Sequence, residues 1–184
     1  APLMLDTEGL TYRRRVLAMI ARQARYLMNI STNAWVIPNN LKAIIGLILS
    51  GLFVPGGEGW LKEGCSLLKV AVEKEVFIDS SLRSEAPQKL LQLYLSFVLL
   101  GEAFKQAGRE EPEEVLGAIL RIEINLKNII HGDGKLALFN GAGIQGGKDI
   151  RLALLKISQK SNKLERPEQS GLARIEKSKS LIIM

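Results

Sequence analysis

The segment His131-Gly132-Asp133-Gly134 holds the residue types in this chain that most readily do chemistry, including its single histidine. An unperturbed histidine has a pKa of about 6.5, so its side chain can act as a general acid or a general base near neutral pH. Asp-Gly favours a tight turn because glycine tolerates positive φ angles. The alternative is that His131 ends the preceding helix beside its C-terminal dipole. The residues alone leave both interpretations of His131 open.

The residues after this turn predict a short extended piece and a second turn. Lys135 to Phe139 is long enough for one short extended piece, and Asn140-Gly141 turns the chain again. A polar turn, an extended piece and a glycine-rich exit suit the presentation of side chains to a ligand. The segment Gly141–Gly147 lacks the patterns of a phosphate-binding loop, because neither Gly-Lys-Ser/Thr nor GxGxxG occurs in it.

Composition bounds the fold and the cofactors. The chain has 184 residues, which suits one domain or part of a larger one. Aromatic residues make up only 5% of it, so aliphatic side chains must build the core, which favours packed helices over a β-sandwich. One cysteine allows no internal disulfide, and one histidine with one cysteine gives no zinc-binding constellation. We therefore expect no metal and no cofactor.

The net charge of +6 is carried by basic residues that gather near the two ends of the chain. Such a balance suits a polyanionic partner, which would be an acidic polysaccharide, a nucleic acid or an anionic lipid; the alternative is a solvated basic face. We expect no nucleic-acid partner, since no binding motif accompanies the charge. The basic residues are Arg13, Arg14, Arg15, Arg22 and Arg25 near the start and Lys148, Arg151, Lys156, Lys160, Lys163 and Arg166 near the end.

Two further observations concern membranes and compartment. The longest apolar run, Leu41 to Val54, has 14 residues, whereas a bilayer-spanning helix needs about 20. No membrane span is therefore expected. No signal-peptide pattern begins at Ala1, and the sequence does not decide between a periplasmic and a cytoplasmic location in a bacterium.

Hydrophobic periodicity predicts a mainly α fold. Helical spacing of apolar residues, with proline or glycine at the breaks, predicts helices over about 10–28, 41–54, 60–77, 88–106 and 113–130. Short loops between such helices favour antiparallel helical hairpins. A short helix over 149–158, a polar linker over 159–169 and a strand over 172–184 complete the prediction.

Three segments resemble bacterial heparinase II/III-like proteins in their order and spacing. They are HGDGKLALFNGAG (131–143), YRRRVLAMIARQARYL (12–27) and SGLARIEKSKSLIIM (170–184). The resemblance implies an incomplete α/α toroid followed by a β-sandwich. Residues 1–158 would then belong to the toroid, 159–169 would form a linker, and 170–184 would be the first strand of a truncated β-sandwich.

The resemblance also implies an activity. Active members of the family cleave uronate-containing polysaccharides, such as glycosaminoglycans or alginate, by β-elimination, which needs a base, an acid and a donor to the sugar carboxylate. His131 stands roughly where such lyases have a catalytic tyrosine. The residues that would bind the substrate are Asp79, Arg83, Asp133 and Asn140. The alternatives are an exposed arginine without a specific role at position 83 and turn-forming roles for Asp133 and Asn140.

One departure from the family pattern favours an alternative function. Ser80-Ser81-Leu82 replaces the glycine-containing turn and polar groups that relatives carry after the aspartate. The alternative is a non-catalytic glycan-binding or scaffold protein on the same fold. We expect residues 1–184 alone to be inactive, because the β-sandwich would supply part of the site. The sequence does not indicate the glycan or the oligomeric state.

Overall fold

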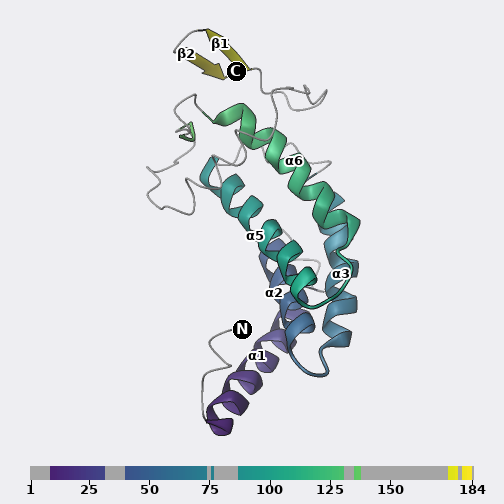
Figure 1. The fold of residues 1–184 in the computed structure, drawn as a ribbon. Helices are drawn as coiled ribbons and strands as arrows, with labels where there is room; N and C mark the ends of the chain where they lie inside the picture. Colours follow the sequence, from purple (N-terminus) through teal and green to yellow (C-terminus); the bar gives the residue numbers. More distant parts are fainter. Residues whose placement is uncertain are drawn as a thin grey trace. The chain divides into compact units, whose positions relative to one another are not determined.

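The chain folds mainly into α-helices, as the sequence predicts (Figure 1). The computed structural model describes residues 9–31, 40–73, 76, 87–130, 135–137, 174–177 and 180–183. Two compact units are present. One comprises residues 1–71 and 100–112, and the other comprises residues 72–99 and 113–184.

The five predicted helices are confirmed, with small changes at their ends. The first continues to Ser31, beyond the predicted end at Met28, and the third begins at Glu58, whose carboxylate lies in the first turn. A negative charge there is favoured by the positive end of the helix dipole. The helices are α1 (Leu10–Ser31), α2 (Asn40–Phe53), α3 (Glu58–Val72), α5 (Pro87–Gln106) and α6 (Glu113–Ile129).

A tight turn joins α2 to α3 in the first unit. The amide of Gly57 donates to the carbonyl of Val54 over 3.0 Å, and Gly56 takes a φ of 78°. Residues with a side chain rarely adopt that left-handed backbone conformation, whereas glycine, which has no Cβ atom, adopts it at little cost. The Gly57 carbonyl then accepts from the amide of Leu61, which starts α3. The result is the helical hairpin that the sequence predicts.

The two helices of this hairpin approach each other at backbone distance. A Cβ atom built on Gly51 would lie 2.5 Å from the backbone nitrogen of Leu61 and 2.7 Å from its Cα. Further along, a Cβ on Gly64 would lie 2.6 Å from Cγ1 of Ile48. Glycine at these positions therefore lets α2 and α3 pack more closely than any side chain would allow.

Helix α1 packs against α2 with one side only. Ala24 is fully buried, and Leu27 lies against Gly46, where a Cβ atom would come within 3.2 Å of Cδ1 of the leucine. Helix α2 is nearly all apolar, and its buried side chains form the core of this unit around Leu47 and Ile48. The opposite side of α1 faces solvent.

Helix α5 ends in a Schellman motif. The amide of Arg109 donates to the carbonyl of Phe104, and the amide of Gly108 donates to that of Lys105, each over 3.0 Å. Gly108 has a φ of 64°, the left-handed geometry that this motif requires. The Arg109 guanidinium also donates to Oε1 of Glu58 over 2.7 Å, an exposed pair. Such pairs add about 0–1 kcal/mol.

The core of the second unit lies along α6 and the N-terminal part of α5. Helix α6 buries an apolar stripe, as its period predicts. The fully buried or nearly buried apolar side chains of this unit are Val72, Val76, Leu90, Leu91, Phe97, Val115, Ala118, Ile122, Leu126, Ile129, Ile130, Leu136 and Ala137.

The C-terminal segment forms two strands where the sequence predicts one. Strand β1 (Arg174–Lys177) pairs with β2 (Ser180–Ile183) in an antiparallel hairpin, with Arg174 opposite Ile183. The alternating pattern over 172–184 identified extended chain correctly but gave no sign of the turn between Lys177 and Ser180. The predicted helix over 149–158 and the linker lie outside the described residues, and the domain boundaries at 158 and 169 stay predictions.

No helix in the described part of the chain is both long and apolar enough to cross a membrane.

The close approach of α2 and α3 at Gly51 leads to a prediction about stability. Gly51→Ala should lower the free energy of unfolding by about 2–3 kcal/mol, because the new methyl group meets backbone atoms of Leu61 and the helices must move apart. Urea denaturation followed by circular dichroism of the full-length protein measures the change.

Gly59→Ala is the matched control in the same hairpin. Gly59 is exposed on α3 and nothing lies within 4 Å of the position of its Cβ. Alanine should leave the stability unchanged or raise it by up to about 1 kcal/mol through its higher helix propensity. Equal effects of the two substitutions would contradict the close packing of α2 and α3.

Candidate functional site

All five residues predicted from the sequence to form a site lie outside the described residues. His131, Asp79, Arg83, Asp133 and Asn140 therefore keep the status of predictions. The described chain includes only the residues that flank the first motif, Ile130 and Lys135.

The flanks of the histidine motif are nevertheless informative. Ile130 and Leu136 form an isolated antiparallel bridge, and the amide of Ala137 donates to the carbonyl of Ile129 over 2.8 Å. The segments on the two sides of the motif therefore run antiparallel, with Leu136 beside Ile130. The predicted extended piece is present as this single bridge, and its last two residues, 138 and 139, lie outside the described part.

A buried polar cluster is the first site of possible chemistry in the described part of the chain. It consists of Tyr94 on α5 and of Glu123 and Lys127 on α6. Glu123 is only 4% exposed, and its Oε1 lies 3.5 Å from the ammonium nitrogen of Lys127, one turn further along the helix. Tyr94 is also buried, and the charge of Glu123 acts on its hydroxyl. A buried carboxylate needs such a partner, because desolvating an unpaired charge is costly.

Burial is the main cause that raises the pKa of the Tyr94 hydroxyl, and the negative charge of Glu123 raises it further. Both effects disfavour the phenolate. Tyr94 therefore keeps its proton at neutral pH and is poorly suited to serve as a general base. We interpret the ion pair as structural, since it lies within α6 and compensates the buried charge of Glu123.

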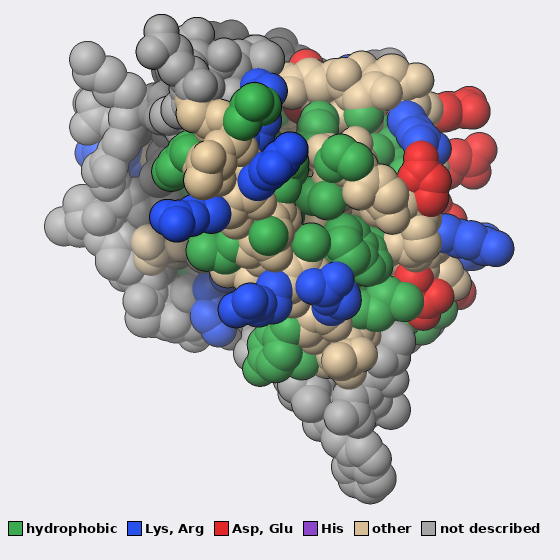
Figure 2. All heavy atoms as spheres, turned by 90° about the horizontal axis from the view of Figure 1, so that it is seen from below, with side chains coloured by type: hydrophobic (Ala, Val, Ile, Leu, Met, Phe, Trp, Pro, Cys, Tyr) green, Lys and Arg blue, Asp and Glu red, His purple; other side chains and the backbone are tan. Residues whose placement is uncertain are grey.

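The second candidate is the solvent side of α1. Tyr12, Arg15, Met19, Arg22 and Tyr26 follow one another at spacings of three and four residues, which places them on one face of the helix. We call this set the arginine–tyrosine stripe. Tyr12 is 57% exposed, Met19 56% and Tyr26 66%, and both arginines are exposed. Figure 2 shows Lys and Arg side chains interspersed with hydrophobic ones on the face seen from below.

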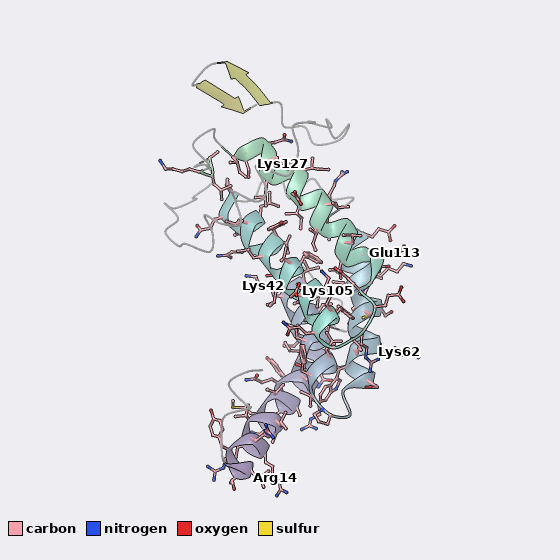
Figure 3. All side chains as sticks on the ribbon, viewed as in Figure 1. Arg14, Lys42, Lys62, Lys105, Glu113 and Lys127 are labelled. Carbon is pink, nitrogen blue, oxygen red and sulfur yellow. The ribbon has the colours of Figure 1, made fainter. Side chains whose placement is uncertain are left out.

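The charge of α1 is one-sided. Its sequence contains five arginines and no aspartate, glutamate or lysine. Arg14, Arg15, Arg22 and Arg25 form no ion pair with other residues in the part of the chain that the structure describes. Arg14 lies near the N-terminal end of the helix and projects from it (Figure 3). The helix dipole disfavours a cation in the first turn by about 0.3–1 kcal/mol, but these four arginines lie beyond that turn and carry little of this cost.

The sequence indicates this surface through a seven-residue spacing, which is harder to recognise because Arg13, Arg14 and Arg15 are consecutive. Consecutive residues fan out around a helix, and Arg13 is in fact half-buried whereas its two neighbours are exposed. The informative spacing is seven residues, from Arg15 to Arg22 and from Tyr12 to Met19 to Tyr26. Since the apolar period at Val16, Ile20, Ala24 and Leu27 already explained the helix, the second stripe was missed.

Metal chemistry finds no support among the described residues, where no three histidine, cysteine, aspartate or glutamate side chains cluster closely enough to hold an ion. The single cysteine, Cys65, is half-buried on α3 and forms no disulfide.

Comparison with known proteins found one related protein. The chain is 28% identical over 137 residues to FtsZ-localized protein C of Caulobacter vibrioides (strain NA1000 / CB15N). The alignment covers 73% of this chain and 23% of the relative, so the chain spans about a quarter of that protein's length. No family model matches the chain, and no solved structure gives a significant match.

These comparisons correct the family assignment. The resemblance to heparinase II/III-like proteins is wrong as an identification, because no family model matches the chain and the relative found carries a different name. The physical reason lies in the motif itself. Asp133-Gly134 and Asn140-Gly141 are common turn pairs, and an apolar helix before them is equally common, so the pattern reports chain reversal more than ancestry. The toroid interpretation rested on that resemblance and loses its basis.

The buried cluster generates a pH prediction. Glu123→Gln should lower the pKa at which Tyr94 ionises, because one of the two causes that raise it is removed. In the folded protein Tyr94 holds its proton above its ordinary pKa of 10.0. Its contribution to stability is thus complete below about pH 10 and is lost as the pH rises through the folded-state pKa. Near-ultraviolet absorbance of tyrosinate during an alkaline titration measures the pKa, with Tyr94→Phe to assign the signal.

Glu113→Gln is the control for this titration. Glu113 is an exposed glutamate in the first turn of the same helix, and its replacement should leave the ionisation of Tyr94 unchanged. An unchanged Tyr94 pKa in Glu123→Gln would show that the carboxylate does not act on the phenol.

Proposed function

We propose that this chain is a protein-binding helical segment of a protein that associates with FtsZ. The observation that carries the proposal is the 28% identity over 137 residues to FtsZ-localized protein C, which extends over 73% of this chain. Because the chain spans only 23% of that relative, the activity of the whole protein is part of the proposal.

The described residues support a binding role. Helix α1 displays exposed arginine, tyrosine and methionine side chains, whereas the buried cluster around Glu123 carries a protonated phenol and an internal ion pair. Arginine and tyrosine dominate the energetics of many protein–protein interfaces. The described residues therefore offer a surface for a partner.

Non-catalytic binding of an acidic polysaccharide is the second candidate, and the arginines of α1 favour it. Guanidinium groups bind carboxylates and sulfates through paired hydrogen bonds, and four of the five arginines on this helix are exposed. The β-elimination predicted through His131, with Asp79, Arg83, Asp133 and Asn140 binding the sugar, has no structural test and remains a sequence-based proposal.

The main proposal predicts where the protein goes in a cell. A fluorescent fusion of the full-length protein should concentrate where FtsZ assembles and should become diffuse when FtsZ is depleted. Purified FtsZ should also be retained by the immobilised full-length protein, since localisation through FtsZ requires a physical link.

One binding comparison distinguishes association with FtsZ from binding of an acidic polysaccharide. Retention of FtsZ without retention of heparin or alginate agrees with the main proposal. Retention of either polysaccharide, with no FtsZ bound and an unchanged cellular distribution after FtsZ depletion, would transfer support to the glycan-binding candidate. Formation of new C=C bonds in the polysaccharide, followed by ultraviolet absorbance and lost in His131→Ala, would instead establish the lyase.

A further inference from the structure

The arginine–tyrosine stripe of α1 has the geometry of a helix-pairing seam. Alternate spacings of three and four residues repeat every seven positions, which is the pattern that keeps one face of a helix against a neighbouring helix. From Tyr12 to Tyr26 the stripe extends over about 21 Å, given a rise of about 1.5 Å per residue. It therefore offers a contact about four turns long.

The side of α1 that faces α2 is already occupied. Ala24 is fully buried and Leu27 packs on α2 at Gly46, so the seam points away from its own unit. A helix that is fixed on one side presents its other side without a large ordering cost, which favours docking by a partner.

The composition of the seam indicates what kind of partner fits. Cores of protein–protein interfaces are enriched in tyrosine, methionine and arginine and depleted in lysine, glutamate and aspartate. Helix α1 follows this pattern closely, because all its cations are arginine and it contains no acidic residue. Charge complementarity then requires carboxylates on the partner, placed to meet Arg15 and Arg22.

An anionic membrane fits less well. Helices that lie in a membrane surface keep a continuous apolar face for the acyl chains and place basic residues on the polar face. In the seam, Arg15 and Arg22 stand between the apolar side chains of Tyr12, Met19 and Tyr26. Inserting those side chains would draw the guanidinium groups into the apolar layer at a cost.

We propose that the seam docks an acidic amphipathic helix of a partner protein. Carboxylates seven residues apart on that helix pair with Arg15 and Arg22, and its apolar side chains contact Tyr12, Met19 and Tyr26. This inference deepens the proposed function by naming the surface and the chemistry of the partner, and it rests on that function only for the partner's identity as part of the FtsZ assembly.

The test uses charge reversal on the seam of the full-length protein. Binding is measured to a designed helical peptide that alternates leucine and glutamate at spacings of three and four residues, and separately to purified FtsZ. Arg15→Glu with Arg22→Glu should weaken peptide binding by at least about tenfold, because carboxylates would then face carboxylates. Arginine and glutamate have similar helix propensities, so circular dichroism should show an unchanged helix content.

Lys42→Glu with Lys62→Glu is the matched control. Both lysines are exposed and lie on α2 and α3 of the same unit, and their replacement changes the net charge by the same amount (Figure 3). This control should bind the peptide within about twofold of the unmodified protein. Tyr12→Ala with Tyr26→Ala should also weaken binding, since the seam needs its apolar contacts as well as its charge.

The outcomes separate the two proposals. Loss of both peptide and FtsZ in the arginine variant supports the docking inference together with the FtsZ association. Loss of the peptide with FtsZ binding intact keeps the association and moves it to another surface. Equal weakening by the lysine control, no peptide binding by the unmodified protein, or tighter binding to phosphatidylglycerol vesicles, heparin or single-stranded DNA without dependence on the tyrosines would overturn the docking of an acidic helix.

Discussion

The backbone contact between α2 and α3 at Gly51 constrains the rest of the first unit. Because no side chain separates Gly51 from Leu61, the two helices form a close hairpin, and the apolar surface of α2 is left to bury itself against α3 on one side and α1 on another. Helix α1 must then turn Ala24 and Leu27 inward. The position of the arginine–tyrosine stripe on the solvent side follows from that choice, since its residues lie opposite the buried ones.

The helical part of this architecture was accessible from sequence because periodicity reports burial directly. The predicted stripe of α6 comprises Val115, Ile119, Ile122, Leu126 and Ile129, and all of these are buried except Ile119, which is half-buried. Pro55-Gly56-Gly57 predicts the break between α2 and α3, and Gly108 predicts the end of α5. Features that depend on pairing between distant residues were not accessible. The partner of Glu123 across the helix pair, Tyr94, appeared in the sequence only as a member of an apolar stripe, and the turn within the C-terminal β-hairpin left no signal.

The candidate site likewise has features that the sequence predicts and features that it does not. A motif rich in glycine around one histidine attracted a catalytic interpretation, yet its turn pairs occur wherever a chain reverses after a helix, as Leu136 does against Ile130. The surface with the more unusual composition lies on α1, which contains five arginines and no acidic residue. Its exposed arginine, tyrosine and methionine side chains take no part in the core and are better explained by a partner than by folding.

We propose that the exposed face of α1 contacts FtsZ. A photo-crosslinking amino acid placed at Met19 of the full-length protein tests it most directly, with one at Val70 of α3 as the comparison because that side chain is similarly exposed, at 65%. With purified FtsZ, the account predicts a covalent product from position 19 and none from position 70. Equal products at both positions, or a product from position 70 alone, would contradict it.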